Sequence, residues 1–243
     1  MPKKDLRVEL LAVTPNAQSL IYAAFRQCYS VGFVGDLWPK LLAGEVSQDE
    51  QAKFIDNVLQ SGHESPIEHV SVSFALEGVS RALTHQLVRH RIASYSQQSQ
   101  RYVDESDFDY ILPSSIAKSP RALEKFEETM AYIAQSYGEL KEILKEDGHE
   151  GSKVREDARF VLPQACESKI VVTMNVRTLL NFFELRCCMR AQWEIRRAAK
   201  LMLKLCRENV PVIFDSAGAK CEKLGYCPEG ERFTCGKYPL KDQ

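Results

Sequence analysis

Residues 89–101 concentrate side chains that can bind a phosphorylated ligand. Arg89, His90 and Arg91 come in succession, and four hydroxyl groups and Arg101 follow within ten positions. A guanidinium can donate two parallel hydrogen bonds to a phosphate, and Ser and Gln side chains add shorter contacts to phosphate oxygens and base edges. We therefore predict an anion-binding site. The alternative is the solvated basic end of a helix, where cations also favour the helix dipole.

Arg186 is a second candidate for anion binding. Phe182 and Leu179 lie four and seven positions earlier, so the arginine falls on the apolar stripe of a predicted helix. An inward-facing guanidinium is costly unless an anion meets it. That anion is either a bound ligand or a carboxylate of the chain, for which Glu184 and Glu194 are candidates.

The eight cysteines form two groups. Five lie in apolar or helical surroundings, where a free cysteine behaves as a small core residue: Cys28, Cys166, Cys187, Cys188 and Cys206. The other three, Cys221, Cys227 and Cys235, could hold a metal, but a structural zinc site usually needs four ligands. We therefore predict no metal site and interpret residues 216–243 as a cysteine-containing tail that is flexible or carries free thiols.

Length and charge limit the class of protein. At 243 residues the chain can bury a substantial core, and its net charge of -1 argues against a broad nucleic-acid-binding surface. No apolar run approaches the ~20 residues needed to span a bilayer, and the first five residues lack the apolar stretch of a secretory signal. We predict a cytoplasmic protein that binds neither nucleic acid nor membrane.

Hydrophobic periodicity predicts the elements that position these side chains. Strands are expected at residues 8–13, 68–77 and 169–175, with Gly78 ending the second. A capping box at Ser47 and Glu50 predicts the start of a helix that ends at about residue 61. Further helices are expected at residues 17–28, 80–91, 120–146, 154–161, 177–187 and 191–208. This pattern predicts a single α+β domain over residues 1–215, with a mixed or antiparallel sheet and several long helices.

The predicted helix 80–91 leads into the polar segment. Gln86, Arg89 and His90 stand at i, i+3 and i+4, which would place them on one helix face. Residues 94–106 are polar and are expected to form a loop. The helix face and the loop together would surround the anion.

An Arg-His-Arg sequence followed by seven residues and a serine is the signature of the flavin-dependent thymidylate synthases. Arg89, His90, Arg91 and Ser99 meet it. Segments 62–69, 156–163, 175–186 and 191–195 resemble further segments of this family, in the same order along the chain. The chain therefore resembles the family over roughly residues 63–195.

The resemblance implies an activity and an assembly. It implies reductive methylation of dUMP to dTMP, with 5,10-methylenetetrahydrofolate as carbon donor, FAD as flavin and NADPH as reductant. It also implies a largely helical α+β subunit that assembles into a homotetramer with active sites shared between subunits. The chain has no Gly-x-Gly-x-x-Gly motif, so FAD would not be bound as in a Rossmann fold.

The resemblance also implies which residues bind dUMP. Arg186 would be the catalytic residue, binding dUMP and promoting ionisation of uracil N3; since its pKa exceeds ~12, it would act by stabilising negative charge. Ser99 is expected to be a ligand, because no histidine–aspartate pair is evident to activate it as a nucleophile. The implied dUMP ligands are Gln86, Leu87, Val88, Arg89, Gln97, Gln98, Ser99, Gln100, Arg101, Arg159 and Arg186. Arg159 could alternatively pair with Glu156.

A second set of residues is implied to bind FAD: His63, Ser65, Arg89, His90, Arg91, Gln97, Asn175, Val176, Arg177 and Asn181. Arg177 and Asn181 are one helical turn apart and should face the same way. The alternative for Asn175 is a helix N-cap. A different chemistry would use Cys187 or Cys188, next to Arg186, as the thiolate of the unrelated cysteine-dependent thymidylate synthases.

Two positions depart from the family pattern. Arg190 stands where many members carry histidine, and Gln97 stands where a glutamate is often found. The second change removes a negative charge from the expected site. Any role transferred to either side chain is therefore open.

Overall fold

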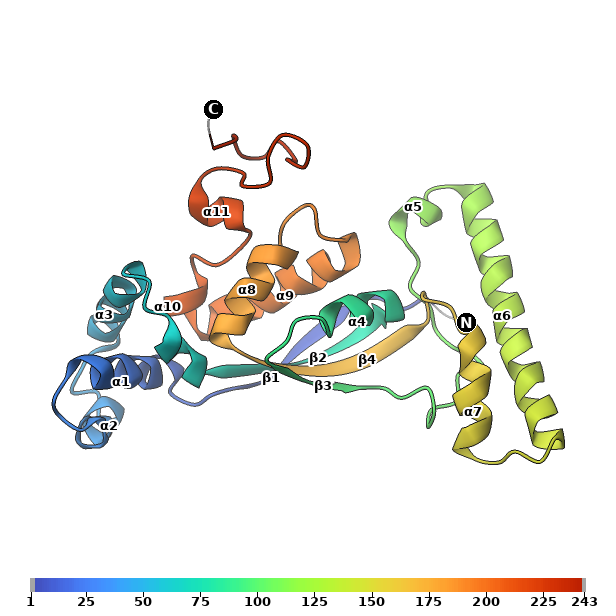
Figure 1. Ribbon diagram of the computed structural model, residues 1–243, viewed down its shortest axis with the longest axis horizontal. Coiled ribbons are helices and arrows are strands. Elements are labelled where there is room, and N and C mark those ends of the chain that lie inside the picture. Colours follow the sequence, from blue (N-terminus) through green and yellow to red (C-terminus); the bar gives the residue numbers. More distant parts are fainter. Residues whose placement is uncertain (1–2, 242–243) are drawn as a thin grey trace. The chain divides into compact units, whose positions relative to one another are not determined.

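The computed structural model describes residues 3–241, which form helices and one four-stranded sheet (Figure 1). The strands are β1 (Arg7–Val13), β2 (Ser71–Ser80), β3 (Ala93–Gln97) and β4 (Glu167–Asn175), in the order β1-β2-β4-β3. The α+β class predicted from the sequence is confirmed.

Backbone hydrogen bonds show that β2 and β4 run in opposite directions. The Val176 N–H donates to the Val70 carbonyl at 2.8 Å, and the Arg81 N–H donates to the Cys166 carbonyl at 3.0 Å. Residue numbers therefore rise along one strand as they fall along the other, which is an antiparallel pairing. Strand β2 begins at Ser71, three residues after the start predicted at residue 68, because Ser65–His69 form a 3-10 helix, η1.

The helices mostly follow the predicted pattern. Within residues 3–241 they are α1 (Ala17–Tyr29), α2 (Val34–Leu42), α3 (Gln48–Gln60), α4 (Arg81–Leu87), α5 (Ser114–Ala117), α6 (Pro120–Glu146), α7 (Ser152–Ala158), α8 (Val176–Arg186), α9 (Trp193–Asn209), α10 (Pro211–Phe214), α11 (Lys220–Leu224) and the 3-10 helices η1 and η2 (Arg159–Val161). The bounds predicted for α6 are confirmed at both ends. Helix α2 was not predicted, and it contains Pro39.

Side-chain caps fix where several helices begin. Ser47 Oγ accepts from the Glu50 N–H at 3.2 Å, Ser80 Oγ from Leu83 at 3.0 Å, and Asn175 Oδ1 from Thr178 at 2.8 Å. Each cap satisfies a backbone donor that has no partner inside the helix. The start predicted at Ser47 and the N-cap alternative for Asn175 are both confirmed.

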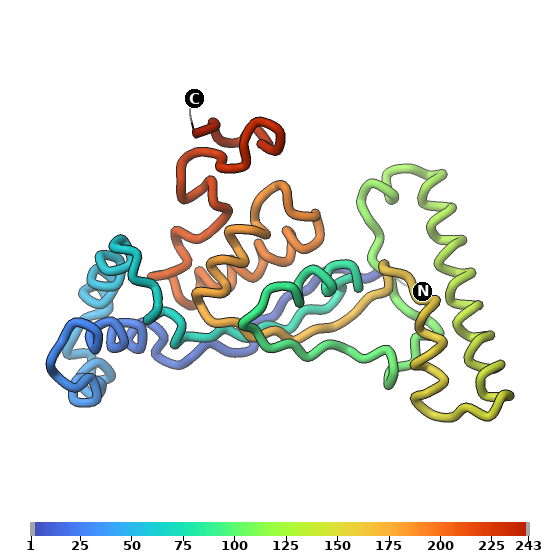
Figure 2. The backbone as a smooth tube through the Cα atoms, in the orientation of Figure 1, coloured from blue at the N-terminus to red at the C-terminus, as the bar shows by residue number. Residues whose placement is uncertain are grey.

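The contacts divide the chain into two compact units, each built from separate stretches of sequence. Unit 1 contains residues up to 7, 76–89 and 95–171, and unit 2 contains 8–75, 90–94 and the chain from 172 onward. In unit 1, Phe108, Tyr110, Met130 and Cys166 form a buried cluster beside α6, and α6 and α7 lie side by side (Figure 2).

Unit 2 has an aromatic core on α8. Phe182 and Phe183 are fully buried, and the Phe183 ring meets Phe214 of α10 edge-on at 5.9 Å between centroids. Helix α8 lies against α9 and η1, and α1 lies against α3. The apolar stripe predicted on α8 therefore faces a packed interior.

Three predictions around the second strand are wrong. Gly78 lies within β2 rather than ending it; its φ is 65°, and a Cβ there would stand 1.9 Å from the Asp5 carbonyl oxygen, so glycine permits a close backbone approach. Helix α4 ends at Leu87 instead of 91, and part of the expected loop 94–106 is strand β3.

The cysteines of the described residues are all free thiols. Cys166, Cys187 and Cys206 are buried as predicted, but Cys28 is exposed on α1, so a core role for it is wrong. Among the described residues, no helix is both long and apolar enough to cross a membrane.

Candidate active site

The Arg-His-Arg motif lies on a turn after α4, so the predicted helix face of Gln86, Arg89 and His90 does not exist. The Leu87 carbonyl accepts a hydrogen bond from the Tyr95 hydroxyl at 2.9 Å. A helix cannot pass through Ile92, whose φ is 64° and whose side chain is 80% exposed. A β-branched residue in the left-handed region is strained, and such strain often accompanies functional sites.

In unit 2 this turn brings His90 to Arg186. The Arg186 Nε–H donates to His90 Nε2 at 2.9 Å, and the His90 ring packs edge-on against Phe182 at 4.9 Å. His90 is only 8% exposed, whereas Arg186 is half-buried at the end of α8. The catalytic candidate is therefore held by a side chain of the signature motif.

His90 is neutral at physiological pH. Burial, and then the positive charge of Arg186, lowers the pKa of His90 from 6.5 to about 4. Burial also lowers the pKa of Arg186, which nevertheless stays protonated. The pair consequently carries one full positive charge.

No carboxylate of the described residues forms an ion pair with Arg186. The alternative of a salt bridge with Glu184 or Glu194 is therefore not what the structure contains, and the guanidinium bonds to His90 instead. Its two terminal amino groups make no hydrogen bond to described residues. A half-buried, uncompensated cation of this kind is suited to an anionic ligand.

In unit 1, Arg101 has the opposite environment. Its terminal amino group forms an ion pair with the Glu156 carboxylate at 2.9 Å, while its Nε is buried without a hydrogen-bond partner among the described residues. The Arg159 Nε donates to the backbone carbonyl of Glu156 at 3.1 Å. Glu156 thus contacts two of the implied dUMP ligands, but its carboxylate pairs with Arg101 rather than with Arg159.

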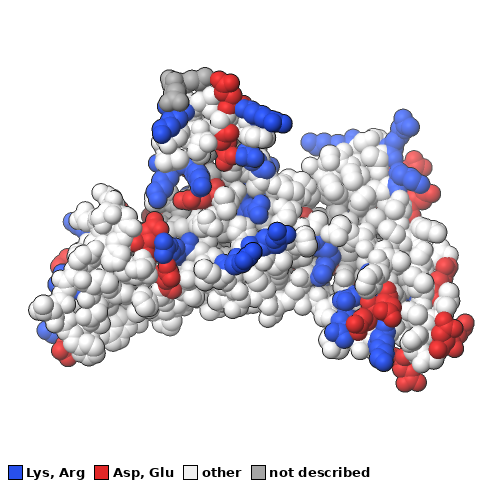
Figure 3. All heavy atoms as spheres, viewed as in Figure 1, with Lys and Arg blue, Asp and Glu red and all other residues white. Residues whose placement is uncertain are grey.

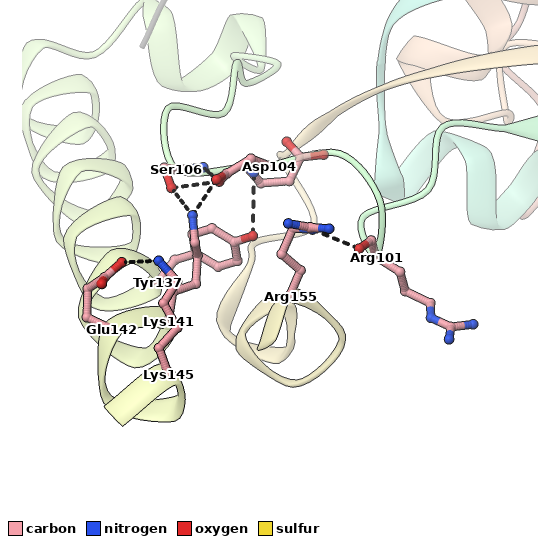
Figure 4. A network of polar contacts seen from close by, with 9 residues as sticks. Arg101, Asp104, Ser106, Tyr137, Lys141, Glu142, Lys145 and Arg155 are labelled. Atoms are coloured by element: carbon pink, nitrogen blue, oxygen red, sulfur yellow. Dashed lines mark hydrogen bonds and ion pairs between the residues drawn. The ribbon is translucent and has the colours of Figure 1, made fainter. Parts of the chain in front are cut away.

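A polar network fixes the loop that carries Arg101 (Figure 4). Arg155 Nε donates to the Arg101 carbonyl at 2.9 Å, and Lys141 of α6 contacts Asp104 at 2.5 Å and Ser106 at 2.7 Å. Burial by itself would raise the pKa of Asp104, but hydrogen bonds from Lys141 and Ser106 lower it to about 2. The loop is therefore anchored from both α6 and α7.

The remaining dUMP candidates of unit 1 differ in how accessible they are. The Leu87 side chain is buried, so only the backbone atoms of Leu87 could bind a ligand. Val88 and Arg89 are exposed. The half-buried members of the set are Gln86, Gln97, Gln98, Ser99, Gln100, Arg101 and Arg159. Val88 and Gln97 line a small polar pocket together with Arg81, Thr84, His85 and Gln164.

Gln97 and Ser99 are held by the protein itself. The Gln97 amide donates to Thr84 Oγ1 and Ser168 Oγ, both at 3.0 Å, so this departure from the family's glutamate is satisfied by two hydroxyls. Ser99 Oγ accepts the Arg101 backbone N–H at 3.2 Å. No hydrogen bond to a histidine activates Ser99 among the described residues, which supports a ligand role over a nucleophilic one.

In unit 2, His63 and Ser65 form a hydrogen-bonded chain with Tyr29. The Tyr29 hydroxyl lies 2.7 Å from His63 Nδ1, and His63 Nε2 lies 3.2 Å from Ser65 Oγ. Tyr29 was not predicted as a site residue. It stands 34 positions before His63, and no local pattern of the sequence links the two.

The N-terminal end of α8 carries the other FAD candidates of unit 2. Val176 is fully buried and its N–H is bound to Val70, so its side chain is not available to a ligand. Arg177 and Asn181 are both exposed, in agreement with a shared face. Arg177 forms ion pairs with Glu64 at 3.6 Å and Glu68 at 2.5 Å.

The two predicted ligand sets are distributed unequally. Apart from Arg186, every dUMP candidate belongs to unit 1. The FAD candidates belong to unit 2, except Arg89 and Gln97. Basic and acidic side chains are interspersed over the face that Figure 3 shows, as the near-neutral charge of the sequence predicts.

The thiol next to Arg186 is poorly suited to nucleophilic chemistry. Burial raises the pKa of Cys187 to about 11, so its thiolate is scarce at neutral pH. A cysteine-dependent mechanism through Cys187 is therefore disfavoured.

Comparison with known proteins agrees with the resemblance. The model of the family described as thymidylate synthase complementing protein, Thy1, matches residues 9–212. A protein of Nitratidesulfovibrio vulgaris named flavin-dependent thymidylate synthase is 65% identical over 99% of this chain and 98% of its own length. Proteins of the same name from Clostridium tetani and Geobacter sulfurreducens are 47% and 46% identical, each over 96% of this chain and 94% of their own length.

Proposed function

The chain belongs to the family of flavin-dependent thymidylate synthases, and we propose that it methylates dUMP to dTMP with FAD as its flavin. In this proposal 5,10-methylenetetrahydrofolate supplies the carbon and NADPH the electrons. Residues 1–215 would form the catalytic domain, and the protein would assemble into a cytoplasmic homotetramer whose subunits share active sites.

The observation that carries the proposal is the environment of Arg186. Its Nε–H is used by neutral His90, and its terminal amino groups have no partner among the described residues. These groups can donate hydrogen bonds to the pyrimidine of dUMP and stabilise the negative charge that forms when N3 ionises. Arg186 does not act as a base, because a guanidinium keeps its protons in a protein.

Arg101 and Arg159 would bind the dUMP phosphate. Arg101 Nε is buried without a partner, which fits a phosphate oxygen of the ligand. Glu156 keeps both guanidinium groups in place before the ligand arrives. The anchors Lys141 and Arg155 restrict the loop, so less conformational entropy is lost on binding.

The exposed face at the beginning of α8 fits a flavin nucleotide. Arg177 is exposed there and could exchange its Glu64 and Glu68 partners for a diphosphate, and Asn181 lies one turn further on the same face. Ser65 and His63 belong to or precede η1, which packs against α8. When bound, FAD supplies the redox chemistry, accepting hydride from NADPH and passing reducing equivalents toward the nucleotide.

The direct test is NADPH oxidation that depends on dUMP, measured with and without added FAD, together with dTMP formation. The proposal expects a flavin absorption spectrum in the purified protein or after FAD addition, and dTMP only when the folate is present. NADPH oxidation without dTMP when dUMP, FAD and the folate are all present would reject the synthase activity. Sedimentation analysis with the flavin bound would test the tetramer.

A further inference from the structure

The C-terminal tail is ordered with very little apolar burial. Residues 220–241 contain α11 and a bridge between Cys227 and Leu240, yet Cys227, at 7% exposed, is the one buried side chain of this described segment. A segment this short cannot build its own core, and such segments are commonly fastened by a disulfide or a metal. Its cysteines therefore call for an explanation.

One cavity of unit 2 gathers the cysteines of the tail with two from the end of α8. Its lining includes Cys187, Cys188, Cys221, Cys227 and Cys235. Five of the eight cysteines of the chain thus meet at one place, where α11 and the following tail lie beside the α8–α9 region (Figure 1). From the sequence, the tail offered three thiols and no fourth ligand; the fold brings in the fourth.

Cys188, rather than Cys187, completes the set. Consecutive residues at a helix end point in different directions, so both are not expected to face one point. Cys187 is buried, at 8% exposed, whereas Cys188 is half-buried, as is Cys221 of the tail.

The surroundings of the cavity suit a negatively charged metal–thiolate group. Four basic side chains line it, Arg190, Lys200, Lys220 and Lys237, against three carboxylates, Glu184, Glu222 and Glu229, so basic groups are in excess by one. Arg190 forms an ion pair with Glu229 and lies over the Phe233 ring at 4.3 Å, which holds the tail against the cavity. A divalent cation with four thiolates carries two negative charges, which these cationic side chains stabilise.

We propose that Cys188, Cys221, Cys227 and Cys235 bind one thiophilic divalent cation, of the zinc class, in a tetrahedral site that fastens the tail beside α8. Zinc is the ion that four cysteine ligands commonly hold in structural sites. No three His, Cys, Asp or Glu side chains within residues 3–241 already stand in metal-binding geometry. The sulfur atoms therefore converge by rotation about χ1 and a shift of the tail when the metal binds, because the thiols alone do not attract one another.

The test is metal analysis of the full-length protein after reduction, chelation and equilibration with zinc chloride. We expect one zinc per chain in the wild type and in the control Cys28→Ser, whose side chain is exposed on α1. Cys221→Ser and Cys235→Ser alter half-buried and exposed side chains, so they should fold, and they should lower zinc occupancy about tenfold or more. Cobalt in place of zinc should give thiolate-to-cobalt charge-transfer absorption in the wild type and in Cys28→Ser, but not in Cys221→Ser or Cys235→Ser.

Three results would overturn the proposal. In the first, the wild type retains no more zinc than Cys221→Ser. In the second, the cobalt complex of the wild type shows no thiolate-to-cobalt charge transfer. In the third, freshly purified protein contains a disulfide among the four cysteines. The site takes no part in the proposed synthesis of dTMP, so loss of zinc and loss of catalysis are separable readouts.

Discussion

Arg101 in unit 1 and Arg186 in unit 2 are two candidate ligand-binding guanidinium groups in opposite electrostatic surroundings. Arg101 is paired with a carboxylate, Glu156, at 2.9 Å. Arg186 is bonded at 2.9 Å to His90, whose pKa is lowered by burial and by Arg186 itself, so the imidazole stays neutral. The first positive charge is compensated before a ligand arrives, and the second is not.

This difference suits two kinds of negative charge. A phosphate is anionic throughout the reaction, so a pre-paired arginine can exchange one anion for another at a modest net gain. A pyrimidine becomes anionic only as N3 ionises, and a fixed uncompensated cation stabilises that state more than the neutral ground state. Arg101 would therefore govern binding, and Arg186 the chemical step.

The largest effect is expected from Arg186→Lys. An ammonium is a point charge without the planar fork of the guanidinium, so kcat should fall about 10²–10³-fold while bound flavin is retained. Steady-state dTMP formation at saturating dUMP measures this. Arg197→Lys, an exposed position on α9, is the matched control. An Arg186→Lys enzyme with wild-type kcat would remove the distinction between the two arginines.

The neutral state of His90 predicts a loss of stability in acid. The folded pKa of about 4 lies below the ordinary 6.5, so the unfolded chain takes up the proton first as the pH falls. The stabilisation is fully present above pH 6.5 and is lost between 6.5 and about 4. The difference between a pKa of 6.5 and one of about 4 corresponds to at most about 3.4 kcal/mol of unfolding free energy.

Denaturant unfolding of the wild type and His90→Gln across this range measures the effect. Glutamine can accept the Arg186 N–H without titrating, so the difference between the two proteins isolates the histidine. Parallel stability curves would mean that His90 has the same pKa in the folded and unfolded chains.

A smaller effect is expected from Glu156→Gln, which makes Arg101 resemble Arg186. Removing the carboxylate leaves Arg101 uncompensated, and KM for dUMP should fall roughly two- to fivefold with kcat unchanged, since a partly exposed ion pair contributes only ~0.2–1 kcal/mol. Asp157→Asn, exposed on the same helix, is the control. If KM rises instead, the Glu156 carboxylate acts chiefly by positioning Arg101.

The smallest effect concerns the turn that delivers His90 to Arg186. Ile92→Asn replaces a strained β-branched residue at φ 64° with one that tolerates this conformation, and should stabilise the protein by about 1 kcal/mol. Thermal unfolding should show a higher Tm than the wild type. Val31→Asn, at a fully exposed position without positive φ, should leave Tm unchanged.

Local patterns predicted the elements well where the chain determines its own structure. The stripe of α6, the cap at Ser47 and the strand β1 follow from neighbouring residues, and all three are confirmed. The predicted end of α4 was wrong because the chain turns back after Leu87, with the Tyr95 hydroxyl bonded to the Leu87 carbonyl and a left-handed backbone at Ile92, and the helical spacing of the side chains does not show this turn.

The site was predicted as a set of residues but not as an arrangement. The apolar stripe of α8 correctly marked Arg186 as unusual, yet the sequence offered Glu184 and Glu194 as partners and the fold supplies His90. Tyr29 beside His63 was missed for the same reason: the contact depends on how helices pack, which no local spacing encodes.

The uncompensated charge of Arg186 is tested most directly by NMR of dUMP labelled with ¹⁵N at N3 and bound at saturation. We expect N3 to be deprotonated near neutral pH on the wild type, and to regain its proton on His90→Glu, where a carboxylate would compensate Arg186. A bound dUMP that keeps its N3 proton on the wild type, or loses it equally on both proteins, would contradict the account.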